Sequence, residues 1–506
     1  MNYLITQNNT SVDLNSIPVS QYKEFKTAVS LLVQDENFHC LLYYGFHYQD
    51  LLKFICAIAN DETGAIYVFS FELPSNQKHQ LEALTNEHFA FHIFEREIHE
   101  NFGIEYINHP WLKPVRYAHN RANFQNQIAN YPFFKIEGSE IHEIGVGPIH
   151  AGVIEPGHFR FMCNGENVLH LEIQLGFQHR GIEQLFIDKT KLSQRHLLAE
   201  SIAGDTVVGH TYTFVKNMEQ LYGINENIRL EVIRTIALEL ERIAVHVGNL
   251  SALCLDMAYQ LGSAVFGALR TPIINFFQLW CGNRFSRTLI RTGFNPYPLT
   301  NDLCNKLNAV LDDFELKYVE MSDETFNLPS VLGRLERTGM ITAEQMKLIG
   351  AVGIPARATG IERDVRKSHA YAYYKHLKHE TVTHPTGDIL SHALIRDQEI
   401  KKSIALIRKL ITVLATMPVA EPNTKPDYQS LNLKPNQLSI AITEGWRGEI
   451  CHSAITDLNG NLIHYKVKDP SMHNWLALAL AVRNNEISDF PVCNKTFDLS
   501  YCGHDL

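Results

Sequence analysis

The sequence contains no Cys-x-x-Cys pair, although nine cysteines are spread over its 506 residues. Proteins that hold zinc or an Fe–S cluster with thiolates commonly use such pairs. An odd number of cysteines scattered along a long chain also argues against a disulfide framework. We therefore expect reduced thiols, as in a cytosolic protein, and no Fe–S cluster held by this chain alone.

Long apolar runs and basic clusters are also missing. No apolar run reaches the ~20 residues that span a bilayer, and the nearest candidate, 261–282, is interrupted by Arg270 and Pro272. The first residues lack the basic-then-apolar pattern of a signal peptide. The net charge is −10 without a dense Lys/Arg block, which disfavours nucleic acid as a partner. The sequence predicts a chain without a transmembrane segment that can still dock on a membrane partner.

The composition is that of a globular protein, with 45% hydrophobic and 20% charged residues, and the length allows two or three domains. Residues 1–115 have the pattern of a small α/β domain, with helix-like segments and with β-rich runs at 38–47, 54–59 and 65–73. Residues 116–140 are rich in Asn, Pro and aromatic residues and have no clear period, so we predict a linker there.

Residues 141–506 differ in pattern. Apolar residues recur every three or four positions between 229 and 250, which predicts a helix with one buried face, and similar patterning continues to about 415. Strand-like runs precede and follow this region, and Asn-Gly at 459–460 signals a hairpin. After a helix at 474–482 we expect an irregular tail. The predicted fold class is α+β: an N-terminal α/β domain, then a mostly α-helical domain with small β-sheets at its start and end.

The segment 95–110, EREIHENFGIEYINHP, resembles the signature of the small soluble subunit of respiratory complex I. That signature has Glu-Arg-Glu, an acidic residue, Phe-Gly-Ile and His-Pro, and Glu100 stands where the family usually has Asp. A simpler explanation of Glu-Arg-Glu is a solvated first helical turn that the helix dipole favours. The resemblance implies a small-subunit-like domain over residues 1–115.

Segments of the second part resemble the large subunit of NiFe hydrogenases and its complex I descendant, which walls the quinone pocket. They follow one another in the family order and read GPIHAGVIEPGHFRF (147–161), LGFQHRGIEQLF, LELERIAVHVGNL, ARATGIERDVR and EGWRGEI. A fusion of the small and large subunits is typical of formate-hydrogenlyase-type, energy-converting membrane hydrogenases. The resemblance implies a large-subunit-like domain over residues 141–506.

The four thiolates of a NiFe site are missing from this chain. Such a site needs two Cys-x-x-Cys pairs, because soft sulfur ligands hold the nickel and bridge to the iron. The corresponding positions carry Ala203, Thr206, Ser500 and Gly503. Cys493 and Cys502 lie near the second pair but out of register. We therefore expect no NiFe cluster.

Two residues of the 147–161 stretch are candidates for catalysis. Glu155 matches the glutamate that passes protons out of the hydrogenase site, and burial in an apolar loop would favour the proton-carrying form that a relay needs. His158 matches the loop histidine that donates to quinone in complex I. The family's quinone tyrosine has no counterpart beside Gly204, since the next tyrosine is Tyr212. The alternatives are a carboxylate that caps backbone amides and a histidine satisfied within its loop.

The resemblance implies further residues around a ligand cavity. His150, His179 and Arg180 are the candidates for cofactor binding, with quinone as the cofactor. Glu183 matches a glutamate that helps hold magnesium in hydrogenases, and oxygen ligands suit Mg²⁺. The histidine that completes that magnesium site is out of register, since His504 is displaced. For Arg180 the alternative is a structural ion pair.

Two interpretations of the function stay open at this stage. In the first, the chain is a peripheral-arm subunit of a membrane-bound NADH–quinone oxidoreductase or hydrogenase-related complex, and it forms the redox cavity and couples electron transfer to ion translocation. In the second, it is a non-catalytic coupling or scaffold subunit that has lost NiFe chemistry. The resemblance attaches NAD binding to the complex, whereas this chain has no Gly-x-Gly-x-x-Gly fingerprint of its own.

The same resemblance implies the partners and the location. A small Fe–S subunit would supply electrons, antiporter-like subunits would form the membrane arm, and quinone would be the small-molecule partner. The chain would lie on the cytoplasmic side of the inner or plasma membrane as a peripheral subunit.

Overall fold

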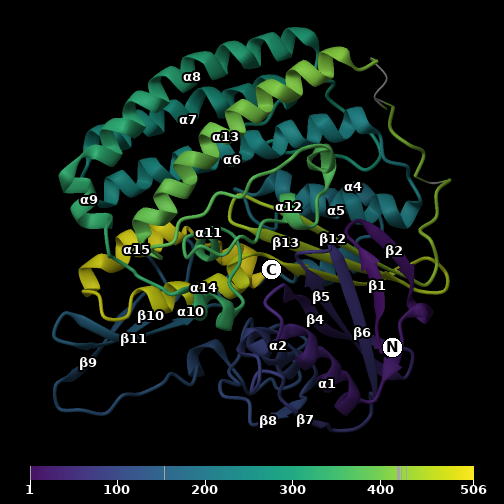
Figure 1. Cartoon of the computed structure of the whole chain (residues 1–506). Helices are drawn as coiled ribbons and strands as arrows, with labels where there is room; N and C mark the ends of the chain where they lie inside the picture. Colours follow the sequence, from purple (N-terminus) through teal and green to yellow (C-terminus); the bar gives the residue numbers. More distant parts are fainter. Residues whose placement is uncertain (1, 153, 419–421, 423, 429) are drawn as a thin grey trace.

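The structure is a computed structural model that describes residues 2–152, 154–418, 422, 424–428 and 430–506. Helices and sheets are segregated along the chain, which confirms the α+β prediction. Figure 1 shows the long helices α6, α7, α8 and α13 along one side and the N-terminal strands on the opposite side, with the C-terminal strands and helices between them. Their bounds are Ile228–Asp256, Gln260–Cys281, Asn301–Asn327 and Ile389–Thr416.

A mainly antiparallel sheet organises the N-terminal part. Its strand order is β1-β6-β5-β4, and β3 pairs in parallel with β6. The helices α1 (Tyr22–Val33) and α2 (His92–Phe102) pack against it, as the sequence predicts for 21–36 and 87–103. The strands are β1 (Leu4–Gln7), β3 (Val19–Ser20), β4 (Phe38–Tyr48), β5 (Leu51–Asn60) and β6 (Ala65–Pro74).

The strand β2 (Thr10–Asp13) leaves this sheet and joins the C-terminal one. It pairs antiparallel with β12, so the second sheet has the order β14-β13-β12-β2. Its other strands are β12 (Gln437–Glu444), β13 (Glu449–Thr456) and β14 (Leu462–Lys468). The predicted boundaries at 115 and 140 stay predictions, but the two predicted domains share this sheet.

The third sheet carries the loop of interest. It has the order β11-β10-β9, with β9 (Ile141–Val146), β10 (His158–Asn164) and β11 (Asn167–Gln174). A two-stranded parallel sheet joins β7 (Gln80–Glu82) to β8 (Glu105–Ile107). Between β8 and β9 the chain has little regular structure, in keeping with the predicted linker.

The C-terminal tail is helical, so the prediction of an irregular tail is wrong. The helix predicted at 474–482 is α14 (Ser471–Ala481), and the residues after it form α15 (Phe490–Phe497) and α16 (Tyr501–Asp505). The last two helices are too short to show a period in the sequence, and burial of Val492, Cys493 and Phe497 stabilises them instead. The tail therefore runs through the interior.

The remaining helices connect these layers. Among the described residues no helix combines the length and the apolarity that a membrane crossing needs. The shorter helices are α3 (Ile182–Asp188), α4 (Leu192–Ala199), α5 (Val207–Tyr222), α9 (Pro329–Leu335), α10 (Ala343–Ile349), α11 (Ile354–Arg357) and α12 (Val365–Ser368), with the 3-10 turns η1 (Leu14–Ser16), η2 (Phe89–Phe91), η3 (Ile128–Asn130), η4 (Ala372–His376) and η5 (Ile487–Asp489).

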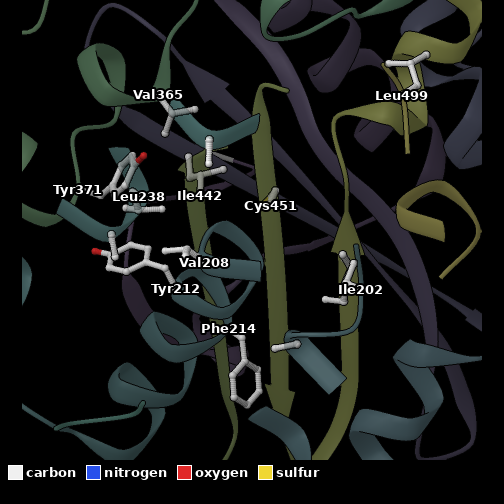
Figure 2. Packing of buried hydrophobic residues seen from close by; sticks show 14 of the residues in the cluster. Ile202, Val208, Tyr212, Phe214, Leu238, Val365, Tyr371, Ile442, Cys451 and Leu499 are labelled. Atoms are coloured by element: carbon white, nitrogen blue, oxygen red, sulfur yellow. The ribbon is translucent and has the colours of Figure 1, made fainter. Parts of the chain in front are cut away.

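The main core lies between α5, α6 and the C-terminal sheet. Figure 2 shows Val208, Tyr212 and Phe214 of α5 beside Ile442 of β12 and Cys451 of β13. All five side chains are fully buried. Burying a large apolar side chain stabilises a fold by about 1.5–3 kcal/mol, so this core fixes α5, and with it the segment just before α5, against the sheet.

Candidate functional site

The loop between β9 and β10 is closed at its base by two histidines. His150 Nε2 donates to the carbonyl of Gly157 at 2.8 Å, and His158 Nδ1 donates to the carbonyl of Gly147 at 3.1 Å. A Cβ added to Gly147 would lie 2.2 Å from the Gly157 oxygen, so only glycine allows this closure. Val153 of the same stretch lies outside the described residues. Each predicted histidine therefore uses one ring nitrogen within the loop.

Glu155 faces the C-terminal tail. Its carboxylate is half-buried and accepts a long hydrogen bond, 3.4 Å, from the backbone N–H of Cys502 in α16. Burial raises the pKa of the Cys502 thiol to about 11, and the Glu155 charge adds to this effect. The contact with Cys502 N–H is what a capping carboxylate would make, while the relay role stays a prediction.

Two further predicted residues also hold the tail. Arg180 donates to the carbonyl of Cys502 at 3.2 Å and to the carbonyls of Ser201 and Ile202 at 2.6 and 2.9 Å. His179 Nδ1 donates to the carbonyl of Asp505 at 2.8 Å. Glu155, His179 and Arg180 thus converge on the backbone of α16.

Glu183 lies apart from them, beside β14. Its Oε1 accepts from the N–H of Val467 at 2.9 Å and lies 3.0 Å from the Lys466 ammonium. A lysine already provides the positive charge next to this carboxylate, and the described residues contain no cluster of three or more His, Cys, Asp or Glu that could hold a metal ion. These surroundings do not fit a magnesium site.

The four positions where a NiFe site would have thiolates are engaged in the fold. Ala203 is buried, and Thr206 Oγ1 accepts from Trp446 Nε1 at 3.1 Å. Ser500 Oγ accepts from the N–H of Gly503 at 2.9 Å and so caps α16. A Cβ on Gly503 would lie 2.7 Å from the Asp469 carboxylate. Neither the donor set nor the space fits a nickel–iron cluster.

An arginine that the sequence analysis did not single out joins these two segments. The Arg447 guanidinium forms a two-pronged ion pair with Asp205, with N–O distances of 2.7 and 2.6 Å. It also donates to the carbonyl of Asp498 and lies over the ring of Trp446, 3.9 Å from its centroid. Burial alone would raise the pKa of Asp205, but Arg447 holds it below its usual value.

The space beside this pair is small. The cavity next to Gly204 and Asp205 measures about 20 Å³, enough for about one water molecule. By contrast, His179 and Glu183 line a cavity of about 350 Å³ together with Glu97 and Glu100 of α2. The larger space therefore lies toward the N-terminal part.

A buried row of polar groups starts next to Gly503 and was also missed. His210 Nε2 lies 3.0 Å from Asp469, His210 Nδ1 lies 3.1 Å from His452 Nε2, and His452 Nδ1 lies 2.8 Å from the Tyr465 hydroxyl. Tyr465 is also part of the wall of the 350 Å³ cavity. No local sequence motif predicts this row, because it forms only when α5 packs on β13 and β14.

Comparison with known proteins places the chain among subunits of redox complexes. It is 24% identical to hydrogenase-4 component G of Escherichia coli (strain K12) over 393 residues, which are 78% of this chain and 67% of that protein. It is 29% identical to the carbon monoxide-induced hydrogenase of Rhodospirillum rubrum over 361 residues, 71% of this chain and 97% of the relative.

A third relative spans both parts of the chain. The C/D subunit of the NADH-quinone oxidoreductase of Phocaeicola vulgatus (strain ATCC 8482 / DSM 1447 / JCM 5826 / CCUG 4940 / NBRC 14291 / NCTC 11154) is 25% identical over 466 residues, 85% of this chain and 88% of that protein. This agrees with a fused large subunit. The family model described as "Respiratory-chain NADH dehydrogenase, 49 Kd subunit" matches residues 263–505. Residues 263–505 of the chain are therefore similar to the 49 kDa subunit of respiratory-chain NADH dehydrogenase.

Proposed function

We propose that the chain is a peripheral-arm subunit of a membrane-bound complex related to hydrogenases and NADH–quinone oxidoreductases, and that it couples or holds neighbouring subunits without nickel–iron chemistry. The observation that carries this proposal is the Arg447–Asp205 ion pair between the two segments that would hold the metal. A guanidinium paired in this way is a permanent cation, and it links these two segments without a metal.

The surface around the 147–157 loop supports a partner subunit. Ile149 and Ile154 of this loop leave 81 and 50% of their surface exposed. Two large apolar side chains exposed on one loop favour burial against another protein. We propose that a small Fe–S subunit docks over residues 147–210, with the membrane antiporter-like subunits of the complex beyond it.

A second candidate function is quinone reduction at this edge. Glu155 favours it, because its carboxylate is half-buried, accepts a long hydrogen bond from the Cys502 N–H and lies on the loop that carries His158. In this version Glu155 moves a proton to the reduced quinone while the electrons come from the Fe–S partner. The residues of this chain bind and protonate the quinone, and they transfer no electron themselves.

The variant Glu155→Gln separates the two candidates in the intact complex. Glutamine keeps the shape and the hydrogen-bonding reach but cannot give up a proton. If Glu155 relays protons, coupled turnover should fall by about 10²–10⁴-fold, the range that general acid–base groups supply. If the chain couples or holds subunits, turnover should change less than about twofold. Glu143→Gln is the matched control, because Glu143 lies on the same hairpin and pairs with Arg160.

Two further measurements complete this test. Pull-down from native membranes should show that both variants still recover the Fe–S subunit, so that loss of assembly is not mistaken for loss of chemistry. Elemental analysis of the native complex should find no stoichiometric nickel in this subunit. Nickel near one atom per chain would contradict both candidates.

A further inference from the structure

An apolar cavity of about 400 Å³ lies between α2, the linker, β11 and α14. Aromatic and aliphatic side chains form its walls, among them Trp111, Phe134, Leu171, Trp475 and Leu476. Small-molecule sites commonly enclose roughly 300–1,000 Å³. The cavity is therefore large enough for a ligand of about ten to fifteen non-hydrogen atoms, at roughly 30 Å³ for each water-sized group.

A buried arginine on its wall has no acidic partner. Arg96 is only 6% exposed, and among the described residues no carboxylate lies within ion-pair distance of it. Its Nε and Nη2 donate to the carbonyls of Lys113 and Pro114 at 2.8 and 2.9 Å, and the guanidinium lies over the Trp111 ring at 4.3 Å. In the described part of the chain Nη1 has no hydrogen-bond partner. A buried cation without a counter-charge is costly.

The nearest carboxylates are already committed to other groups. Glu172, which also lines the cavity, pairs with Lys113 at 2.5 Å and accepts from the N–H of Phe134 at 2.7 Å. Glu100, one turn along α2 from Arg96, accepts from the backbone N–H groups of Val115 and Arg116. Among the described residues Glu100 and Glu172 thus act on Arg96 only at a distance, and neither forms a direct ion pair with it.

A second unpartnered group lies next to Arg96 on the same helix face. His92 is four residues earlier in α2, so the two side chains are neighbours. Its ring is 2% exposed and is stacked on Phe89 and Trp111, with centroid distances of 4.8 and 5.2 Å, and in the described part of the chain neither ring nitrogen has a hydrogen-bond partner. An imidazole and a guanidinium therefore line one end of an apolar cavity.

We propose that this cavity binds an amphiphilic carboxylate, of the size of a medium-chain fatty acid. The carboxylate would accept hydrogen bonds from Arg96 and His92, and the hydrocarbon body would lie on Trp111, Trp475 and Leu476. Arg483 also lines the cavity but already donates to His170 at 3.0 Å. The Arg96 guanidinium matches a ligand with one negative charge, and the apolar walls disfavour a small hydrated anion such as phosphate. This inference does not depend on the proposed function of the subunit.

Titration of the full-length protein with decanoate tests the proposal. Two of the four tryptophans, Trp111 and Trp475, line the cavity. Binding can therefore be measured by intrinsic tryptophan fluorescence as well as by calorimetry. We expect decanoate to bind roughly 10- to 100-fold more tightly than decanol, the ratio that a charge-assisted hydrogen bond supplies. Phosphate should not compete with it. Equal affinity for decanoate and decanol, or no binding of decanoate up to its solubility limit, would overturn the proposal.

Variants locate the polar end. Arg96→Met should lower the affinity for decanoate by the same 10- to 100-fold and leave decanol binding unchanged. Arg121→Met is the matched control, because Arg121 also donates to backbone carbonyls but does not line the cavity, and its decanoate affinity should equal that of the parent. If Arg96→Met does not fold, His92→Phe is the second variant, because it keeps the ring stack. It should lower the affinity for decanoate and leave the affinity for decanol unchanged. Unchanged decanoate affinity in a folded Arg96 or His92 variant would refute the assignment.

Discussion

At the scale of single residues, the main feature is the arginine that links the segment before α5 to the C-terminal tail. Arg447 contacts Asp205 on the segment before α5 and the Asp498 carbonyl in the tail. It therefore joins the same two segments that a NiFe cluster would join. A planar guanidinium suits this position because its donors fit a carboxylate and a carbonyl at once.

We predict that Asp205→Asn destabilises the protein by about 1–3 kcal/mol at neutral pH. The Asp205 side chain is 38% exposed, so water compensates part of the loss. Its pKa is depressed in the folded state, so the stabilisation is present above the unfolded value near 3.9 and is lost as the pH falls through the folded value. Urea unfolding at pH 7 measures the difference.

An exposed ion pair provides the control for this prediction. Asp302 pairs with Lys306 on the surface of α8, and Asp302→Asn should change the free energy of unfolding by less than about 1 kcal/mol. Arg447→Lys should retain only part of the stabilisation that the pair with Asp205 provides, since an ammonium cannot form both hydrogen bonds. If Asp205→Asn proves as mild as Asp302→Asn, Arg447 does not hold the tail as we describe.

At the scale of secondary-structure elements, the sequence allowed prediction of those that carry a long signal. The helix α6 and the strands β12 and β13 show clear apolar periods, and the structure has them where they are expected. The strand β2 and the helix α16 were not predicted, because four or five residues are too few to show a hydrophobic period. Their structure depends on partners that come from the other end of the chain.

The same limit applies to the candidate site. The residue pattern drew attention to Glu155 and Arg180, and both contact Cys502 in the tail. It gave no sign of the Arg447–Asp205 pair or of the His210–His452 row, since each needs two distant elements to pack first. Motifs indicated which segments meet, while tertiary packing decided what fills the space between them.

A buried carboxylate connects four helices in the layer above the C-terminal sheet. Glu399 of α13 lies 2.7 Å from Arg357 of α11, 2.6 Å from Arg366 of α12 and 2.8 Å from His246 of α6. Burial alone would raise the pKa of Glu399, but the arginines hold it well below its usual range. The carboxylate is therefore charged at neutral pH.

We predict that Glu399→Gln costs about 3–5 kcal/mol, because it leaves buried arginine charge uncompensated. Denaturant unfolding of the purified protein checks this. Asp312→Asn is the comparison at the surface of the same helix α13, since Asp312 of α8 pairs there with Arg408 of α13, and it should cost less than about 1 kcal/mol. A Glu399 variant as stable as the Asp312 variant would show that the helices hold together through apolar packing alone.

At the scale of the whole molecule, the N-terminal part and the large-subunit-like part are joined by polar contacts as well as by β2. Lys466 of β14 pairs with Glu97 of α2 at 2.5 Å, and His39 of β4 pairs with Glu449 of β13 at 2.8 Å. His473 of α14 donates to the carbonyl of Ala90, before α2, at 3.0 Å. These buried contacts make the stability of the whole chain depend on protons taken up where the two parts meet.

His473 reports this dependence. Burial lowers its pKa to about 3, while an unfolded histidine titrates near 6.5. The folded state keeps the ring neutral, so protons bind to the unfolded chain first and stability falls as the pH drops below 6.5.

His473→Gln removes the titration and keeps a donor for the carbonyl of Ala90. Between pH 7.5 and 5.5 the parent should lose about 1.4 kcal/mol of unfolding free energy relative to this variant. Urea unfolding at both pH values measures the difference, and His376→Gln, at an exposed position, should show none. Parallel behaviour of the parent and His473→Gln would mean that water reaches this contact between the two parts.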